Sequence, residues 1–358
     1  MRLCARLLAS IAALLVPPLL TSPAKSAEEN CALKPLVTLP MTEAPSGLFT
    51  IPMTLNGRET HLVLDTGGGI RALKPFVVEE LGLRRIQGDV RMLDVKGNSS
   101  LDQVRVPSVT FAGVALPEGM VFSVMAGPSR AEMRSEAEGK DSDLPKVNAG
   151  NSVEGLFTPD IFFGKADLEL DFANKQMILM SNDHCKGKVV HWPAQALAVV
   201  PFLMDGNQIV FPVELDGMKV KAMMDTGASS SAVDLDTVRR KFNIDLESPD
   251  VEKEAQLLPG QFVYRKKFNI LSFEGITVKN PVMSMMPNAI PKEEVTGSRI
   301  RERVVEPPAM LVGMPILRKL HIYIAFREQM LYITPASPVA VPVAPSASQP
   351  EIAPQREN

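Results

Sequence analysis

The sequence contains the same tripeptide twice, each time at the end of an apolar run. Residues 62–70 read LVLDTGGGI and residues 222–230 read AMMDTGASS. An aspartate followed by glycine is ordinary in a solvated turn, so either stretch alone favours a turn over a catalytic site. The existence of a second copy changes that interpretation.

The similarity between the two copies extends beyond the tripeptide, and matching residues are separated by the same number of positions throughout. FTIPMTLNGRETHLVLDTGGGIRAL begins at Phe49 and IVFPVELDGMKVKAMMDTGASSSAV begins at Ile209. Prolines, leucines and glycines recur at the same offset that separates Asp65 from Asp225. Two chance turns would not keep such a register, so the sequence predicts two related halves.

Each copy predicts the same series of local structures. Asn56-Gly57 and Asp216-Gly217 lie between apolar stretches, and such dipeptides favour a two-residue hairpin turn because both residues tolerate positive φ. The second stretch ends at Asp-Thr-Gly, and residues 73–83 and 234–244 then have the pattern of a helix. Each half is therefore predicted as strand, turn, strand, carboxylate and helix.

The ends of the two halves also resemble each other. Residues 155–180 and 311–333 each contain a buried apolar segment, a proline, a short helix and a pair of alternating strands. Alternating strands and frequent turn residues predict that both halves are mostly β. A chain of 358 residues exceeds what one hydrophobic core usually serves, so we expect two lobes.

The predicted boundaries follow from this repeat and from local composition. We expect a signal peptide at 1–26, a first lobe at 31–185, a second lobe at 186–334 and a disordered Pro/Ala-rich tail at 335–358. Two polar stretches, 127–152 and 287–308, interrupt the halves before their closing elements. Their composition favours disorder over functional loops.

The first 26 residues have the composition of a secretory leader. Arg2 and Arg6 precede an apolar run that ends in small residues, and Pro17 and Pro18 break this run, which is short for a membrane span. We expect a periplasmic or secreted protein that is free of the membrane after cleavage, with an uncleaved anchor as the alternative. The net charge of −3 and the lack of a basic stripe exclude a nucleic-acid binder.

Two cysteines, Cys31 and Cys185, remain after the leader. In an oxidising compartment such a pair can persist as a disulfide, and this one would tie the ends of the first lobe together. We expect no metal and no other cofactor, since the two cysteines give no zinc-ligand spacing with the histidines. The four histidines are scattered along the chain, at His61, His184, His191 and His321.

The two Asp-Thr-Gly triplets resemble the active-site loops of the retropepsin-like aspartic peptidases of the pepsin superfamily. The second triplet continues as DTGAS, a helical pattern follows each, and an apolar LVG element lies at 311–313. The resemblance covers most of residues 48–333 and implies two tandem lobes in a bilobal, pepsin-like arrangement with a central cleft. Relatives with one such loop must dimerise, whereas this chain carries both halves and is expected to be a monomer with an internal pseudo-twofold axis.

The resemblance implies an aspartic endopeptidase with Asp65 and Asp225 as catalytic residues and a peptide or protein as substrate. Peptide hydrolysis without a metal or a covalent nucleophile needs a general base for water and a general acid for the carbonyl oxygen. Two facing carboxyls that share one proton supply both, because two like charges so close cannot both ionise easily. The pair titrates as a unit, so the sequence leaves open which aspartate is the acid.

The neighbours of the aspartates have supporting roles by analogy with the family. Thr66 and Thr226 are expected to hydrogen-bond across the lobe junction, and Gly67 and Gly227 to let backbone N–H groups approach the carboxylates. Hairpin flaps are expected near residues 92–102 and 257–267, where they would close over an extended substrate.

The sequence departs from the family pattern at three places. The first loop reads DTGGGI where a small non-glycine residue is commoner, which predicts a less preorganised loop. Thr158 occupies the position that Gly313 has in the second half, and the first predicted flap has no tyrosine.

Two other function classes compete with the endopeptidase. One is a peptide-binding protein that keeps the cleft but has lost catalytic turnover. The retention of both aspartates in their full motifs argues against this alternative. The other is a hydrolase of another mechanism. The sequence has no G-x-S-x-G, no H-E-x-x-H and no suitable Cys/His pairing, and the triple glycine lacks the Lys-Ser/Thr of a phosphate loop.

Overall fold

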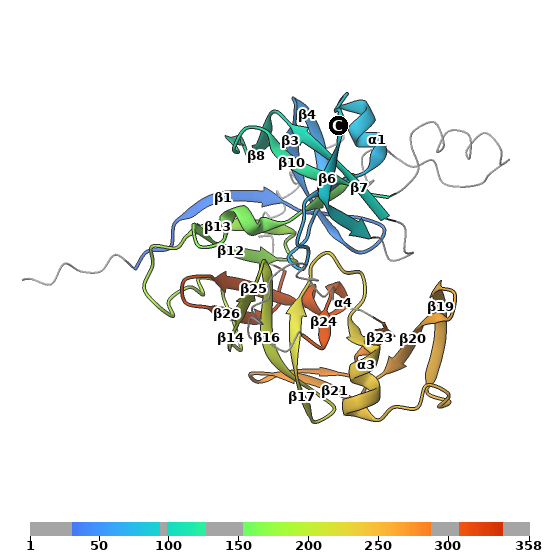
Figure 1. Ribbon diagram of the computed structural model, residues 1–358. Coiled ribbons are helices and arrows are strands. Elements are labelled where there is room, and N and C mark those ends of the chain that lie inside the picture. The colour runs from blue at the N-terminus through green and yellow to red at the C-terminus, as the bar shows by residue number, and fades with distance from the viewer. Residues whose placement is uncertain (1–30, 94–98, 127–152, 288–307, 339–358) are drawn as a thin grey trace, which may run out of the picture.

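The computed structural model describes residues 31–93, 99–126, 153–287 and 308–338. Within them the chain forms two lobes and a sheet that both lobes share (Figure 1). The predicted signal peptide, the predicted stretch 127–152, all but the end residues of 287–308 and most of the predicted tail lie outside the described residues. The boundaries predicted for the lobes stay predictions.

Each lobe is built on a ten-stranded sheet, and the two sheets have the same strand order. The first lobe has β6 (Arg85–Leu93), β7 (Ser99–Val106), β10 (Met120–Val124), β5 (Ala72–Leu73), β11 (Gly155–Phe157), β4 (Arg58–Leu64), β3 (Phe49–Leu55), β8 (Val109–Phe111) and β9 (Val114–Ala115), with β2 (Thr42–Glu43) beside β3. The second lobe has β19 (Val251–Leu258), β20 (Gln261–Lys267), β23 (Val282–Met286), β18 (Ala232–Asp234), β24 (Met310–Val312), β17 (Met218–Met224), β16 (Gln208–Leu215), β21 (Ile270–Phe273) and β22 (Ile276–Lys279), with β15 (Leu203–Asp205) beside β16. The predicted mostly β fold with two tandem lobes is confirmed.

The repeated hairpin is present in both lobes. β3 pairs antiparallel with β4, and β16 pairs antiparallel with β17. The turn residues have left-handed conformations, with φ of 48° and 81° at Asn56-Gly57 and of 46° and 83° at Asp216-Gly217. Because Asn, Asp and Gly adopt positive φ most easily, these dipeptides fix the position of each turn and with it the register of the strands.

Short helices follow the Asp-Thr-Gly loops and the closing strands. The predicted helices are present as α1 (Pro75–Glu80) and as α3 (Leu235–Thr237), which continues into the π-helical turn η3 (Val238–Phe242). The closing elements are the 3₁₀ helix η2 (Pro159–Phe162) and α4 (Met314–Leu317). A proline lies in the first turn of α1, η2 and α4, where its missing N–H would have no helical partner in any case.

A third sheet of six strands joins the lobes. Its order is β1 (Pro35–Pro40), β13 (Gln176–Ser181), β12 (Ala166–Asp171), β25 (Leu320–Ala325), β26 (Met330–Pro335) and β14 (Ala198–Pro201), so each half supplies three strands. The equivalent strands β12 and β25 pair antiparallel at its centre, with Glu169 opposite Tyr323. In Figure 1 this sheet lies between the first lobe, coloured blue to teal, and the second lobe, coloured yellow to red.

The face of the shared sheet that points away from the main core carries a layer of polar side chains, which are buried except for the exposed His191. His184 Nε2 lies 2.6 Å from Asp167 Oδ2. His191 and His321 lie 2.7 and 2.9 Å from the two carboxylate oxygens of Glu169. Three histidines that are scattered in the sequence therefore meet carboxylates behind the shared sheet, although the described residues contain no group of three or more His, Cys, Asp or Glu side chains placed to hold a metal ion.

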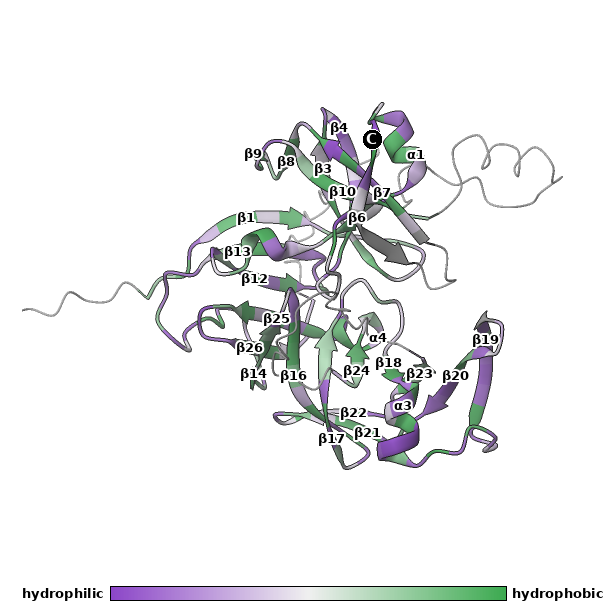
Figure 2. Ribbon diagram, viewed as in Figure 1, coloured by the Kyte–Doolittle hydropathy of each residue, from purple (hydrophilic) through white to green (hydrophobic). Residues whose placement is uncertain are grey.

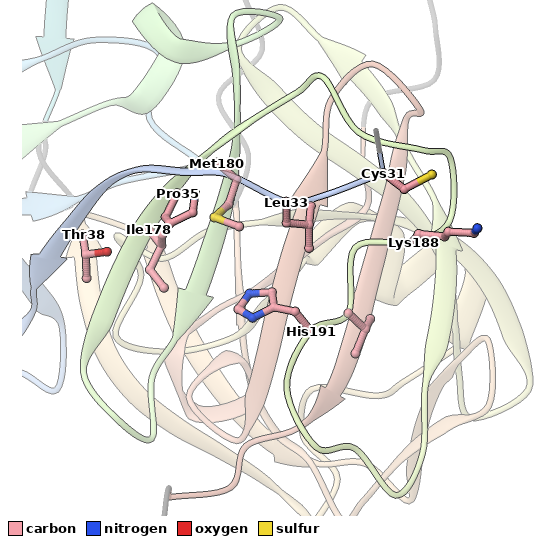
Figure 3. Close-up of a pocket in the computed structure, with 9 residues that line it drawn as sticks. Cys31, Leu33, Pro35, Thr38, Ile178, Met180, Lys188 and His191 are labelled. Carbon is pink, nitrogen blue, oxygen red and sulfur yellow. The ribbon is translucent and has the colours of Figure 1, made fainter. Parts of the chain in front are cut away.

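A disulfide between Cys31 and Cys185 lies at the edge of this layer. It links two residues 154 positions apart and ties the start of the first lobe to the segment that leads into the second. A hollow of about 530 Å³ lies beside Cys31, and neither Asp65 nor Asp225 lines it. Figure 3 shows the side chains that do. The residues that line the hollow include Leu33, Pro35, Ile178, Met180, Lys188 and His191.

One continuous apolar core runs through both lobes and along the inner face of the shared sheet. Leu62, Phe157, Met310, Val312 and Ile322 are fully buried within it. Figure 2 shows the contrast between the hydrophobic strand β24 and the hydrophilic hairpin of β19 and β20. Among the described residues, no helix has the length and apolar character needed to cross a bilayer.

Candidate active site

Asp65 and Asp225 lie just after equivalent strands and meet at the junction of the lobes. β11 runs parallel to β4, and β24 runs parallel to β17. Strands β11 and β24 hold the backbones of the two aspartates. Asp65 N donates to Phe157 O at 2.9 Å, and Asp225 N donates to Val312 O at 3.0 Å. The two carboxyl groups are in hydrogen-bond contact with each other. The structure therefore brings both sequence-predicted carboxyls into one site.

Thr66 and Thr226 join the two loops by hydrogen bonds that cross the junction. Thr66 Oγ1 donates to Met224 O at 3.0 Å, and Thr226 Oγ1 donates to Leu64 O at 2.5 Å. Each hydroxyl also accepts the backbone N–H of the other threonine, at 3.1 Å in both directions. Both threonines are buried. Separating the loops would leave these buried groups without partners, so the network fixes the distance between the aspartates.

Gly67 and Gly227 each lie against the aspartate of the opposite loop. A Cβ added at Gly67 would lie 2.4 Å from Cγ of Asp225, and one added at Gly227 would lie 2.6 Å from Cγ of Asp65. Gly67 N also donates to Asp65 Oδ1 at 3.0 Å, and Gly227 N donates to Asp225 Oδ1 at 2.8 Å. A side chain at either position would push the two carboxyls apart.

The next residue is where the two loops differ. Gly68 N donates to Asp65 Oδ1 at 2.7 Å, whereas the equivalent Ala228 N donates to the backbone carbonyl of Asp225 at 3.4 Å and interacts only weakly with the Asp225 carboxyl. A Cβ at Gly68 would lie 2.4 Å from Asp65 Oδ2. The second glycine of the first loop therefore gives the Asp65 carboxylate a second N–H donor, which is more order than the sequence predicts for this loop.

The two lobes also differ at the residue that follows the closing strand, which is Thr158 after β11 and Gly313 after β24. A Cβ at Gly313 would lie 2.4 Å from the carbonyl oxygen of Ser230, so the second lobe needs glycine there. The first lobe has Thr158, whose hydroxyl donates to Asp160 Oδ1 at 2.7 Å, and Asp160 pairs with Arg71 at 2.8 Å. An ion pair beside the first loop thus replaces the tight backbone packing of the second loop.

Besides Thr226, the side chain of Gln208 in the second lobe also contacts the first loop. Gln208, the first residue of β16, donates from Nε2 to the carbonyl oxygen of Gly67 at 3.3 Å. The equivalent residue of the first half is Leu48, whose side chain has no donor for Gly227. The second lobe is therefore linked to the first loop by a hydrogen bond that has no equivalent between the first lobe and the second loop.

The two carboxyls have pKa values raised to different degrees. Burial, and then the negative charge of Asp65, raises the pKa of Asp225 well above its usual range, and the N–H groups of Gly227 and Ala228 oppose this rise only in part. Burial also raises the pKa of Asp65, and the N–H of Gly68, the contact with Asp225 and the N–H of Gly67 oppose this rise. The arrangement favours the state in which the pair holds one proton.

Comparison with known families agrees with this geometry. A family model described as aspartyl protease matches residues 51–136 and 211–316, one stretch in each lobe, which together make up more than half of the chain. The chain belongs to the aspartyl protease family. Asp65 lies in the first matched stretch and Asp225 in the second. No curated protein matches the chain.

Hairpins lie at both positions where this aspartyl protease family member is expected to have flaps. β19 and β20 pair antiparallel and turn at Pro259-Gly260, where Gly260 has a φ of 79°. β6 and β7 pair in the first lobe, and their connection, residues 94–98, lies outside the described residues. Both hairpins lie on the right-hand side of the view in Figure 1. Their closure over a substrate stays a prediction.

Sequence reasoning missed the polar groups that distinguish the two halves of this aspartyl protease family member. Gln208 falls opposite Leu48 in the register of the repeat, and this polar-for-apolar difference is a signal that the sequence does contain. Arg71 and Asp160 carry no comparable signal, because 89 positions separate them and their contact depends on the closing of the lobe.

Proposed function

We propose that the protein is an aspartic endopeptidase in which Asp65 and Asp225 activate a water molecule for attack on a peptide bond. Membership of the aspartyl protease family supports a protease-like function and a peptide substrate. The observation that carries the proposal is the pairing of a buried carboxyl, Asp65, with a half-buried one, Asp225. A glycine of the opposite loop packs against each carboxyl, and each accepts a backbone N–H of its own loop.

The 2.7 Å bond from Gly68 N to Asp65, which has only a weaker counterpart from Ala228 N to Asp225, favours one assignment of roles. Asp65 is the base, and its carboxylate takes a proton from water as the water oxygen attacks the peptide carbonyl carbon. Asp225 carries the shared proton and gives it to the carbonyl oxygen, so a neutral diol forms. Asp65 then gives its proton to the leaving nitrogen, Asp225 takes a proton from one diol hydroxyl, and the C–N bond breaks. This returns both carboxyls to their starting state.

The test compares the wild-type protein with Asp65→Asn and Asp225→Asn on a diverse peptide pool across about pH 3–7. Each substitution should lower cleavage by about 10²–10⁴-fold, the usual contribution of general acid–base catalysis. Asp236→Asn, at an exposed position of α3, is the matched control. A statine-type inhibitor should block the wild-type protein.

Two outcomes would contradict the proposal. Cleavage that survives either dyad substitution would remove the two-carboxyl mechanism. Peptide binding by the wild-type protein without any cleavage would favour the peptide-binding alternative.

We also propose that the chain is exported to the periplasm or secreted, loses residues 1–26 as its leader and acts as a monomer with an internal pseudo-twofold axis. The Arg-flanked apolar leader and the Cys31–Cys185 disulfide support export into an oxidising compartment. The presence of both aspartates in one chain supports a monomer. N-terminal sequencing and sedimentation of the exported protein test this, and a product that keeps Met1 or is active only as a dimer would contradict it.

A further inference from the structure

The peptide group between Gly67 and Gly68 has a hydrogen bond at each end. Its N–H, on Gly68, donates to Asp65 Oδ1 at 2.7 Å, and its carbonyl, on Gly67, accepts from Gln208 Nε2 at 3.3 Å. The bond from Gly68 is the shorter of the two N–H bonds to this carboxylate, since the one from Gly67 is 3.0 Å. Because a peptide group is planar, contacts at its opposite ends fix its rotation.

The glycine-rich loop needs such an external contact. Gly68 and Gly69 have no side chain, and glycine has more backbone freedom than any other residue. A hydrogen bond accepted by the Gly67 carbonyl also polarises the peptide, which strengthens its N–H as a donor. Gln208 therefore acts on the orientation and on the strength of the bond that Asp65 receives from Gly68.

Gln208 is itself held firmly in the second lobe. It begins β16, and its backbone lies opposite Asp205 in the hairpin that β15 and β16 form. The side chain thus extends to the first loop from a fixed strand end. Leu48 is the equivalent residue of the first half, and its side chain has no N–H group that could donate to the second loop.

We propose that Gln208 is a positioning residue that fixes the Gly67–Gly68 peptide and thereby keeps the Asp65 carboxylate ionised and aimed at the attacking water. The proposal rests on the proposed endopeptidase function. The ionisable group that faces Asp65 is Asp225, on the opposite loop, while Arg71 of the first loop is paired with Asp160. Gln208 contacts Gly67 and no reacting atom, so its effect passes through the loop.

The first test is Gln208→Leu, which copies Leu48. We expect kcat/KM to fall about three- to tenfold, the value of one neutral hydrogen bond, mainly through kcat. The acid limb of the pH profile should move to higher pH, because a carboxylate with a poorer N–H donor is harder to ionise. Gln176→Leu, at an exposed position of β13, is the matched control.

The second test is Gln208→Glu, which makes the hydrogen bond to the Gly67 carbonyl depend on pH. A protonated Glu side chain can still donate to the Gly67 carbonyl, whereas its carboxylate cannot. The activity of this variant relative to wild type should therefore be highest at the acid end and fall as pH rises. Gln208→Leu should show the opposite trend.

The outcomes separate failure of this proposal from failure of the endopeptidase function. Asp65→Asn and Asp225→Asn in the same assay report on the dyad alone. A change in KM with an unmoved acid limb would show that Gln208 contacts the substrate, and an equal loss at every pH with a lower melting temperature would show a purely structural role. Either result overturns the proposal.

A readout without turnover completes the test. In protein labelled with ¹³C at aspartate carboxyls, the Asp65 signal is identified by its absence from Asp65→Asn. Its titration midpoint should be higher in Gln208→Leu than in wild type. An unchanged midpoint would overturn the proposal even if the wild-type protein cleaves no peptide.

Discussion

Gly68 and Gly69 are neighbours in the first loop, yet they should respond differently to the same substitution. A Cβ at Gly68 would lie 2.4 Å from Asp65 Oδ2, while nothing lies within 4 Å of a Cβ at Gly69. We expect Gly68→Ala to lower kcat/KM about tenfold or more, because displacing a catalytic group by a fraction of an ångström is costly. Gly69→Ala should stay within about twofold of wild type. Steady-state kinetics with one peptide measures both.

Equal losses in the two variants would contradict this explanation. They would mean that backbone freedom of the loop, rather than space beside the Asp65 carboxylate, determines activity.

The raised pKa of Asp225 predicts how stability depends on pH. A folded-state pKa above the unfolded value means that the folded protein binds the proton more tightly, so stability falls as pH rises from about 4 through the folded pKa. Asp225→Asn removes this penalty. The variant should melt at least about 2 °C higher than wild type at pH 7, equivalent to about 1 kcal/mol, and at the same temperature near pH 3.

Thermal melts across this range provide the measurement, with Glu118→Gln at an exposed position as the control. A stabilisation of Asp225→Asn that is the same at both ends of the range would show that packing, rather than charge, is responsible.

At the scale of elements, the two Asp-Thr-Gly loops depend on the threonine bonds that join them. Thr66→Val keeps the shape of the side chain but leaves the carbonyl of Met224 and the N–H of Thr226 without their partner. Each lost partner of a buried group costs about 1–3 kcal/mol, so the free energy of unfolding should fall by at least that amount. Urea unfolding measures the change.

Thr66→Ser retains the hydroxyl and is the control for this prediction. It should keep most of the stability that Thr66→Val loses. Two variants of equal stability would indicate that the threonine methyl group, and not the hydrogen bonds, stabilises the junction.

The elements that carry the site could be predicted because their signals are local. Asn56-Gly57 and Asp216-Gly217 determine their own turns, and the strands after them end at the two aspartates. A single register then relates the halves. The hairpins of both lobes and the placement of the carboxyls follow from residues that are close in sequence.

The contacts between distant elements could not be predicted in the same way. The pairing of β12 with β25 places Glu169 opposite Tyr323 and has no local signature in either strand. The contact of His321 with Glu169 depends on that pairing. The Gln208 contact depends on the approach of the lobes, so the sequence reveals the polar residue but not its partner.

At the scale of the whole molecule, the disulfide should contribute much of the stability. Cys31 and Cys185 are 154 positions apart, and closing so long a loop restricts the unfolded chain. We expect Cys31→Ser to lower the free energy of unfolding by about 2–5 kcal/mol. Cys185→Ser should have the same effect, measured by urea unfolding without reductant.

The double variant Cys31→Ser/Cys185→Ser provides the control. Because the two residues form one bond, it should lose no more stability than either single variant. Losses that add would mean that each side chain stabilises the fold on its own and that the bond between them contributes little.

The difference between the two loops affects the direction in which an extended peptide would lie across the two aspartates. Two identical loops would accept an extended peptide equally well in either direction, forward or reversed. Here one loop has Gly68 where the other has Ala228, and Gln208 is matched by Leu48. We therefore expect the two directions to differ in energy, so that the backbone of a bound peptide alone would place its amino and carboxyl sides on particular lobes, independently of the peptide's side chains.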